Sequence, residues 1–190
     1  MKLPEVFKRD YMYTVIMILI VLLTVFIFWY GMRFFFRTEH PILAVASGSM
    51  EPVLYKGDLI LVEGIQNLSD IHAASEDADP PGDILVYQGA RDLIVHRAVD
   101  KKIVNGRQVF ITHGDANQAG ALEQVDEDSV VGRYTGIKVP VLGHVALFFN
   151  PLEVKVAFIA LWIIALIILE LVPWIRKSFR RDDTEESLYK

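Results

Sequence analysis

The chain has 190 residues, of which 53% are hydrophobic, a high share for a water-soluble protein. Its formal net charge is −5, and residues 38–150 hold sixteen Asp or Glu against eight Lys or Arg. This acidic balance argues against a nucleic-acid partner, because phosphate binding relies on Lys and Arg. The sequence contains no Cys, so any domain must be stabilised by its own apolar core rather than by disulfides.

The first feature in chain order is an apolar run from Tyr11 to Met32. At about 1.5 Å per residue such a helix spans about 33 Å, which is enough for a bilayer core of roughly 30 Å. The alternative is a cleavable signal peptide, whose apolar region is usually about 7–15 residues long and is followed by small residues. Bulky residues follow here, from Arg33 to Arg37. We therefore expect an uncleaved transmembrane helix over residues 11–36.

A second apolar run, from Val156 to Trp174, predicts another transmembrane helix over residues 153–174. Positive residues near membrane helices favour the cytoplasmic side. Those next to the outer ends of the two runs are Lys2, Lys8, Arg9, Arg176, Lys177, Arg180 and Arg181. We therefore expect a two-span protein of the cell membrane. Residues 1–10 and the tail 175–190 would be cytoplasmic, and residues 37–152 would form a domain outside the cytoplasm.

The segment between the two runs is rich in short apolar stretches separated by Gly, Pro, Asn and Asp, a pattern typical of strands and turns. Strands are expected at 42–46, 59–63, 84–87, 93–99, 102–104, 109–112, 129–134 and 139–145. No amphipathic helix of any length is indicated, and residues 66–81 form a polar, acidic loop. The predicted fold is an all-β domain anchored by an N-terminal and a C-terminal transmembrane helix.

The dipeptide Asn105-Gly106 lies between two of these stretches and strongly indicates a two-residue hairpin turn. Such a turn pairs Val104 with Arg107. If the ladder continued without interruption, His96 would lie opposite Asp115, close enough for a carboxylate to accept a hydrogen bond from the imidazole. A bulge, for which Gly114 is one candidate place, would change this register. An ordinary cross-strand polar pair is the alternative interpretation.

The stretch Ser47-Gly48-Ser49, followed by Pro52, suits a stiff and tight turn that presents Ser49 to solvent. Taken alone, this pattern is more typical of an ordinary loop without chemistry. A serine on such a turn, together with a histidine that a carboxylate can orient, matches the requirements of nucleophilic acyl transfer.

Five motifs in this order resemble the type I signal peptidases over residues 42–143. They are Ser47-Gly48-Ser49-Met50-Glu51-Pro52, Gly57-Asp58, Gly82-Asp83-Ile84-Leu85-Val86-Tyr87, Ile94-Val95-His96-Arg97 and Gly114-Asp115-Ala116-Asn117. The usual bacterial members have a lysine base in a segment of the form Ile-Lys-Arg. Because His96 stands at that place, the chain resembles the Ser-His branch, which is found in archaea and in the catalytic subunit of the endoplasmic-reticulum complex.

The resemblance implies Ser49 as nucleophile, His96 as general base and Asp115 as the acidic partner of His96. It also implies that the Ser47 hydroxyl and the Ser49 N–H form the oxyanion hole. A Ser-Lys peptidase is the alternative within the enzyme class. Its base would be Lys101 or Lys102, which flank the hairpin turn.

One position departs from this branch, which usually has a second Asp six residues after the first. Here that position is Ala121. Glu123, Asp126 or Asp128 could substitute if the loop is rearranged, and otherwise Asp115 acts alone.

The function implied is that of a membrane-bound serine endopeptidase, which cleaves signal peptides from translocated preproteins after small-x-small sites. The expected partners are signal peptides of secretory preproteins, the lipid bilayer and the translocation machinery. No cofactor or metal is expected, because no His pair has ligand spacing. The competing hypothesis from another class is a non-catalytic, membrane-anchored β ectodomain, since a fold does not determine function.

Overall fold

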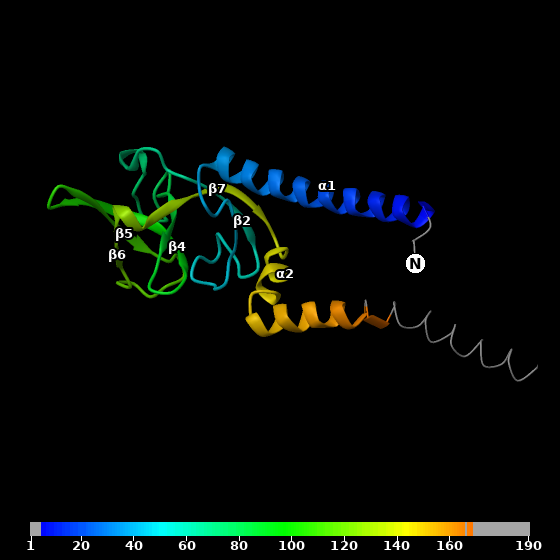
Figure 1. The fold of residues 1–190 in the computed structure, drawn as a ribbon. Coiled ribbons are helices and arrows are strands. Elements are labelled where there is room, and N and C mark those ends of the chain that lie inside the picture. Colours follow the sequence, from blue (N-terminus) through cyan, green and yellow to red (C-terminus); the bar gives the residue numbers. More distant parts are fainter. Residues whose placement is uncertain (1–4, 166, 169–190) are drawn as a thin grey trace, which may run out of the picture. The chain divides into compact units, whose positions relative to one another are not determined.

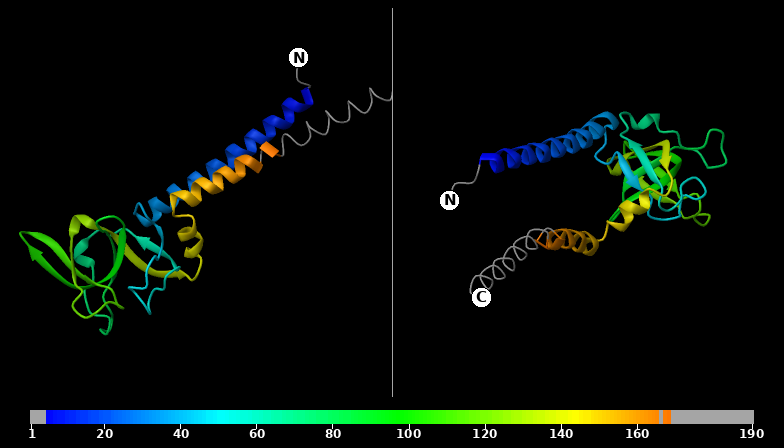
Figure 2. Two further views of the ribbon diagram at one scale, coloured as in Figure 1. Left: turned by 90° about the horizontal axis from the view of Figure 1, so that it is seen from below. Right: turned by 90° about the vertical axis from the view of Figure 1, so that its right-hand side faces the viewer.

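The structure, a computed structural model, describes residues 5–165, 167 and 168 of the chain. These fall into two units, 1–144 and 145–190, each of which is described by itself. The first unit begins with helix α1, Glu5–Phe36, which Figure 2 shows as one continuous helix. Its segment Val15–Phe36 has a mean hydropathy of 2.7 and no buried residues, so by length and composition it could cross a membrane.

The predicted β domain is confirmed: it is one sheet of seven strands, each antiparallel to its neighbours, in the order β1-β2-β7-β3-β4-β5-β6 (Figure 1). The strands are β1 (Ile42–Ala44), β2 (Leu59–Glu63), β3 (Ile84–Gln88), β4 (Leu93–Val104), β5 (Arg107–His113), β6 (Glu123–Asp126) and β7 (Val130–Val139). Two single 3-10 turns, Leu68–Asp70 and Glu127–Ser129, and a short helix α2, Gly143–Phe148, complete the described elements.

The core lies on both faces of strand β3, whose first four residues are all buried. Alternate side chains of a strand point to opposite faces. Ile84 and Val86 accordingly join a cluster with Met50 and Leu54, which lie in and just after the turn of Ser49, whereas Leu85 and Tyr87 join a second cluster around Phe110. The sheet is curved, since β1 and β4, four positions apart in the strand order, line one common pocket. This curvature brings the serine turn to the histidine strand.

The hairpin prediction is confirmed at the turn, where Asn105 and Gly106 both have positive φ, 52° and 79°. Pairing follows the predicted register from Val104↔Arg107 to Asp100↔Ile111. It then shifts by one residue at Val99, so that Arg97 pairs with His113. The prediction that His96 lies directly opposite Asp115 is therefore wrong, because the bulge occurs at Val99 and changes every later pair.

Two further strand predictions differ from the structure. The separate strand predicted at 139–145 does not form: β7 ends at Val139, and the chain turns into α2. Pro140 follows directly and has no N–H for a ladder. Strand β6 was not predicted, because its four residues contain a single apolar side chain, the buried Val125.

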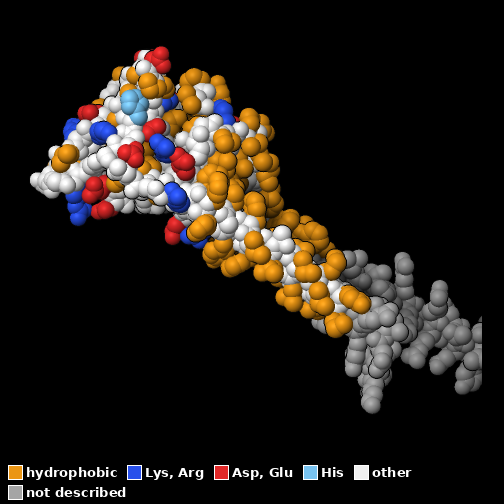
Figure 3. All heavy atoms as spheres, turned by 90° about the horizontal axis from the view of Figure 1, so that it is seen from above, with side chains coloured by type: hydrophobic (Ala, Val, Ile, Leu, Met, Phe, Trp, Pro, Cys, Tyr) orange, Lys and Arg blue, Asp and Glu red, His pale blue; other side chains and the backbone are white. Residues whose placement is uncertain are grey.

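In the second unit, residues 152–165, 167 and 168 are helical. Part of the predicted second span, 153–174, and the whole predicted tail, 175–190, lie outside the described residues, as do residues 1–4 of the predicted cytoplasmic N-terminus. Among the residues that are described, α1 is the one helix found to be long and apolar enough to span a membrane. In Figure 3, hydrophobic side chains cover the described helices, whereas the visible face of the β domain carries charges of both signs.

Candidate active site

The serine turn, residues 47–50, follows β1 directly and is fixed by buried neighbours. Met50 and Leu54 are buried in the core, and the Leu54 N–H donates to the Met50 carbonyl at 2.9 Å. Ser49 itself is partly exposed. Its Oγ lies 3.2 Å from the Oγ of Ser47, so the two hydroxyls share a hydrogen bond. The turn therefore presents a pair of hydroxyl groups on a rigid base.

The Gly57-Asp58 motif supports this turn from the other side. The Gly57 N–H donates to the Val45 carbonyl at 2.8 Å, and the Val45 N–H donates to the Asp58 carbonyl at 2.9 Å. The buried Asp58 carboxylate accepts from the Tyr55 N–H at 3.0 Å and from Lys138 Nζ at 3.1 Å. Burial opposes its ionisation, but these hydrogen bonds and the Lys138 charge outweigh burial and hold the pKa of Asp58 below its usual value.

The loop after β5 meets the serine turn at Gly114. The Ala116 N–H donates to the Ser49 carbonyl at 2.9 Å, which joins the two loops. A Cβ on Gly114 would lie 2.7 Å from the Ser49 carbonyl oxygen and 2.9 Å from His96 Nε2. Real Cβ atoms essentially never come closer than 3.0 Å to another atom. Glycine is thus required for Ser49 and the imidazole to approach this loop together.

His96 lies on β4 opposite Leu85 of β3, and its side chain is buried. Its Nδ1 is 3.1 Å from the Tyr87 hydroxyl, which in turn donates to Glu123 at 2.5 Å. Burial is the main influence on His96 and lowers its pKa below the ordinary value. The Glu123 charge raises that pKa, His113 lowers it and Asp115 raises it, without reversing the effect of burial.

Asp115 binds Arg97, the neighbour of His96 in β4, instead of the imidazole. Arg97 donates from Nε and Nη2 to the two carboxylate oxygens at 2.9 Å and 2.5 Å, and from Nη1 to the Gly82 carbonyl at 2.6 Å. Successive side chains of a strand point to opposite faces, which separates the partners of Arg97 from those of His96. Arg97 thereby links three of the sequence motifs. A catalytic role for Asp115 stays a prediction.

Ser49 and His96 border the same pocket, which has a volume of about 320 Å³. One wall is formed by β1 and the residues that follow it, and the other by the first residues of β4. The lining residues besides Ser49 and His96 are Leu43, Ala44, Val45, Ala46, Ser47, Met50, Leu93, Ile94 and Val95. With the exception of the hydroxyls and the imidazole, all of these side chains are apolar, and two of them are alanines. The pocket can therefore accept small apolar groups next to a serine and a histidine.

No family model matches the chain. The chain is 31% identical over 141 residues to the signal peptidase complex catalytic subunit SEC11 of Eremothecium gossypii, an alignment that covers 68% of this chain and 77% of that protein. It is 30% identical over 158 residues to SEC11C of Homo sapiens, covering 78% and 77%, and 31% identical over 153 residues to SEC11C of Mus musculus, covering 75% and 74%. The chain belongs to the family of signal peptidase catalytic subunits. It is therefore a peptidase, and its general reaction is signal peptide cleavage.

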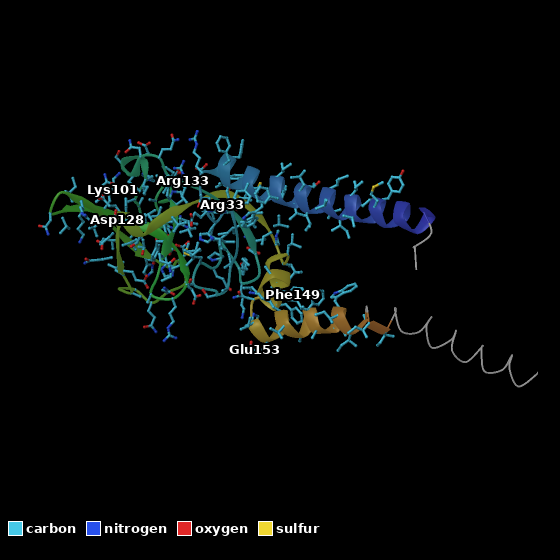
Figure 4. The ribbon with its side chains drawn as sticks, viewed as in Figure 1. Arg33, Lys101, Asp128, Arg133, Phe149 and Glu153 are labelled. Carbon is cyan, nitrogen blue, oxygen red and sulfur yellow. The ribbon has the colours of Figure 1, made fainter. Side chains whose placement is uncertain are left out.

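Two of the other acids that the sequence suggested as partners of His96, Asp126 and Asp128, make their contacts elsewhere in the fold. Asp126 on β6 pairs with Val109 on β5, and Asp128 forms an ion pair with Arg107 at 2.8 Å, near the β4–β5 hairpin (Figure 4). Among the acids that the structure describes, Glu123 is the closest to the imidazole, with Oε2 3.8 Å from His96 Nδ1. Sequence reasoning left Glu123 as one of three alternatives and missed Tyr87, which connects it to the histidine.

The two lysines of the alternative mechanism do not line the pocket. Lys101 Nζ donates to the carbonyls of Ser69 at 3.0 Å and Ile71 at 2.9 Å, and both Lys101 and Lys102 are exposed. Figure 4 labels Lys101 at the hairpin end of the β domain. These positions suit stabilisation of a surface loop rather than abstraction of the Ser49 proton, because neither side chain borders the pocket that holds Ser49.

Proposed function

We propose that this chain is a membrane-bound serine endopeptidase in which Ser49 is the nucleophile and His96 the general base. The observation that carries the proposal is the shared apolar pocket that both residues border. A Cβ on Gly114 would clash with both the Ser49 carbonyl oxygen and His96 Nε2, so the serine turn and the imidazole both approach this glycine, which supports the proposal. The Ser49 hydroxyl is hydrogen-bonded to Ser47 in this structure, and catalytic contacts commonly tighten only when substrate binds.

In the proposed reaction, Ser49 Oγ attacks the scissile carbonyl while His96 Nε2 takes the hydroxyl proton. The tetrahedral intermediate then collapses, the C–N bond breaks, and His96 gives this proton to the leaving amine. A water molecule next attacks the acyl-enzyme and passes a proton to His96, which returns it to Ser49 as the signal peptide carboxylate leaves. The Ser49 N–H and the Ser47 hydroxyl would stabilise the oxyanion in both steps.

The pocket walls suggest how a substrate would bind. Strand β1 is an edge strand, paired with β2 on one side, so an extended peptide could add to the sheet by main-chain hydrogen bonds. Every second side chain of such a peptide points to the same face. Residues −1 and −3 of the substrate would then both face the apolar pocket, and its limited volume would favour small side chains at these two positions.

Asp115 would act on His96 by its charge rather than by a direct hydrogen bond. Its carboxylate is held by Arg97, and it raises the pKa of His96 against the effect of burial. The ion pair also fixes the strand that carries His96 against the loop that carries Gly114. In this proposal Asp115 is a positioning residue, because it reaches the reacting atoms through other groups.

The apolar helix α1 would anchor the enzyme in the membrane, with the β domain outside the cytoplasm and both termini inside. The relatives are named as catalytic subunits of a signal peptidase complex. We extend this to the present chain: it would act on secretory preproteins as part of such a complex, next to the translocation machinery.

The test is cleavage of a secretory preprotein in detergent by wild-type protein and by Ser49→Ala. We expect the variant to lose activity by several orders of magnitude while it keeps the wild-type unfolding temperature. Ser69→Ala, in an exposed turn away from the pocket, is the matched control and should cleave normally. If Ser49→Ala kept more than about a tenth of the activity, the nucleophile assignment would be wrong. The alternative of a non-catalytic ectodomain is not retained, because the chain belongs to a family of catalytic subunits.

A further inference from the structure

We propose that Tyr87 and Glu123 orient His96, as a hydrogen-bonded chain in which the Tyr87 hydroxyl connects the Glu123 carboxylate to His96 Nδ1. This inference rests on the proposed role of His96 as general base and adds two positioning residues to it. The chain of contacts crosses four neighbouring strands, from β3 through β4 and β5 to β6. It would supply the function that a carboxylate performs when it binds a catalytic histidine directly.

The geometry is given by three short contacts on one oxygen. The Tyr87 hydroxyl lies 2.5 Å from Glu123 Oε2, 3.1 Å from Thr112 Oγ1 and 3.1 Å from His96 Nδ1. The strand register explains why these groups meet. Leu85 pairs with His96, so Tyr87, two residues further on the same face of β3, can reach the imidazole. Thr112 pairs with Glu123 across β5 and β6.

The proton count at this oxygen determines the tautomer of the imidazole. A tyrosine hydroxyl has one proton to donate, and an ionised carboxylate can only accept, so the Tyr87 proton is donated to Glu123. The other two contacts must then be accepted by the Tyr87 oxygen. Thr112 donates one of them, and His96 donates the other from Nδ1–H. In the neutral imidazole, His96 Nε2 is consequently unprotonated, and this is the nitrogen that lies against Gly114.

Burial makes this arrangement stable. Tyr87 is 3% exposed and Thr112 is fully buried, so their hydroxyls depend on one another for hydrogen bonds. Burial first, and then the bond to Glu123, raise the pKa of Tyr87 well above its usual range, which keeps the phenol protonated as a donor. The Glu123 side chain is 47% exposed, so its carboxylate is also in contact with water.

Glu123 also supplies the charge that stabilises a protonated His96. Its Oε2 is 3.8 Å from Nδ1, whereas both oxygens of Asp115 are engaged by Arg97. The charged or titratable neighbours of His96 are Glu123 on β6, Tyr87 on β3, His113 on β5, and Arg97 with Asp115. Of these, Glu123 and Asp115 favour the imidazolium, and Glu123 is connected to it through the Tyr87 hydroxyl.

Activity provides the first test, with Tyr87→Phe and Glu123→Gln. Both should lower kcat about 10- to 100-fold, the effect of losing a hydrogen bond to a charged group, and leave KM unchanged because neither residue lines the pocket. In Glu123→Gln the acid limb of the kcat/KM profile should move to lower pH, because the charge that raises the pKa of His96 is gone. The double variant should lose no more than the single variants, since both act through one group.

Matched controls are Asp126→Asn, which removes another carboxylate of β6, and Tyr134→Phe, which removes a hydroxyl of β7. Both should keep the wild-type kcat and pH profile. Wild-type kinetics in Tyr87→Phe and Glu123→Gln would overturn the proposal. Unfolding temperatures identify any variant that loses activity by unfolding, and the half-exposed Glu123→Gln is expected to fold.

The tautomer itself provides a second test that does not use activity. Nitrogen NMR of full-length protein with ¹⁵N-labelled histidine, in the Ser49→Ala background, should show His96 protonated at Nδ1, and Tyr87→Phe should shift this signal toward a mixture of tautomers. A His96→Gln spectrum assigns the resonance. Protonation at Nε2 in the otherwise unchanged protein would overturn the hydrogen-bonded chain. This outcome can be distinguished from a failure of Ser49 as nucleophile, which the preprotein assay detects separately.

Discussion

Arg97 and Asp115 form a two-pronged ion pair with side chains that are 5% and 2% exposed. The pair joins the strand of His96 to the loop of Gly114, and Arg97 adds a bond to the Gly82 carbonyl. Burying two charges is favourable only when both are paired and hydrogen-bonded, so each partner depends strongly on the other.

Asp115→Asn should therefore lower the free energy of unfolding by about 3–5 kcal/mol, because the charge of Arg97 is left buried without a partner. Cleavage should fall with it, since the loop that touches Ser49 and His96 loses its support. Asp128→Asn is the control, because its ion pair with Arg107 is exposed and should contribute about 0–1 kcal/mol. Chemical denaturation of both variants measures the free energy of unfolding. Equal decreases in the two variants would contradict a stabilising role for the buried Arg97–Asp115 ion pair.

Gly114→Ala should reduce kcat much more than it reduces stability. The added methyl group would push against the Ser49 carbonyl and His96 Nε2, so that the two loops could no longer approach as they do. Gly106→Ala is the control: it has φ of +79° at the open hairpin turn, and strain there should cost about 1 kcal/mol without changing kcat. Steady-state kinetics and thermal unfolding of both proteins test this. A normal kcat in Gly114→Ala would show that the contact is dispensable.

The pH dependence of cleavage should reflect the buried position of His96. The base must be neutral to accept the serine proton, and burial lowers the pKa of His96. The acid limb of kcat/KM should therefore have its midpoint below the ordinary histidine value of about 6.5. His113→Gln removes a neighbour that lowers this pKa and should move the midpoint upward. A wild-type midpoint well above 6.5 would mean that another group titrates.

Substitution of the candidate bases should separate a histidine mechanism from a lysine mechanism. His96→Ala should abolish cleavage, and His96→Lys should not restore it, because the site offers Tyr87 as a partner that suits an imidazole. Lys101→Ala and Lys102→Ala should cleave nearly as fast as the wild type. Lys101→Ala should lose some stability, since its two bonds to the loop at Ser69 and Ile71 disappear. An inactive lysine variant, or an active His96→Lys enzyme, would favour the Ser-Lys alternative.

The predicted membrane topology can be measured with single cysteines, because the native sequence has none. Cysteines at positions 2, 88 and 190 would replace Lys2, the exposed Gln88 and Lys190. An impermeant thiol reagent on intact cells should label only the cysteine at position 88. Labelling at either terminal position would contradict cytoplasmic termini.

The local features that depend on neighbouring residues were predictable from sequence. The β2 strand 59–63, the Asn105-Gly106 turn and the long apolar helix follow from apolar patterns and turn residues. The bulge at Val99 was not predictable from the sequence, because no residue type at that place indicates an extra residue in the strand pairing. That single irregularity moved Asp115 out of register with His96.

The candidate site likewise contains residues that local sequence motifs identify and residues that only the fold brings together. The stretches around Ser49 and His96 carry motifs, and the structure places both residues at one pocket. Tyr87 lies in an apolar strand and resembles an ordinary core aromatic, while Glu123 is one of several acids in a short stretch of the chain. Their contact depends on the order of β3, β4, β5 and β6 in the sheet, which no local pattern reveals.

Strand β1 has a further consequence for the protein in solution. An unpaired sheet edge that can accept a substrate strand can also accept a strand from another copy of the protein, which is a route to aggregation. β1 is only three residues long, and the chain bends into the serine turn soon after it. So short an edge gives a neighbouring copy few hydrogen bonds, whereas a signal peptide could gain additional contacts in the pocket. The brevity of this strand would thus let the enzyme keep an open edge for its substrates and still remain dispersed.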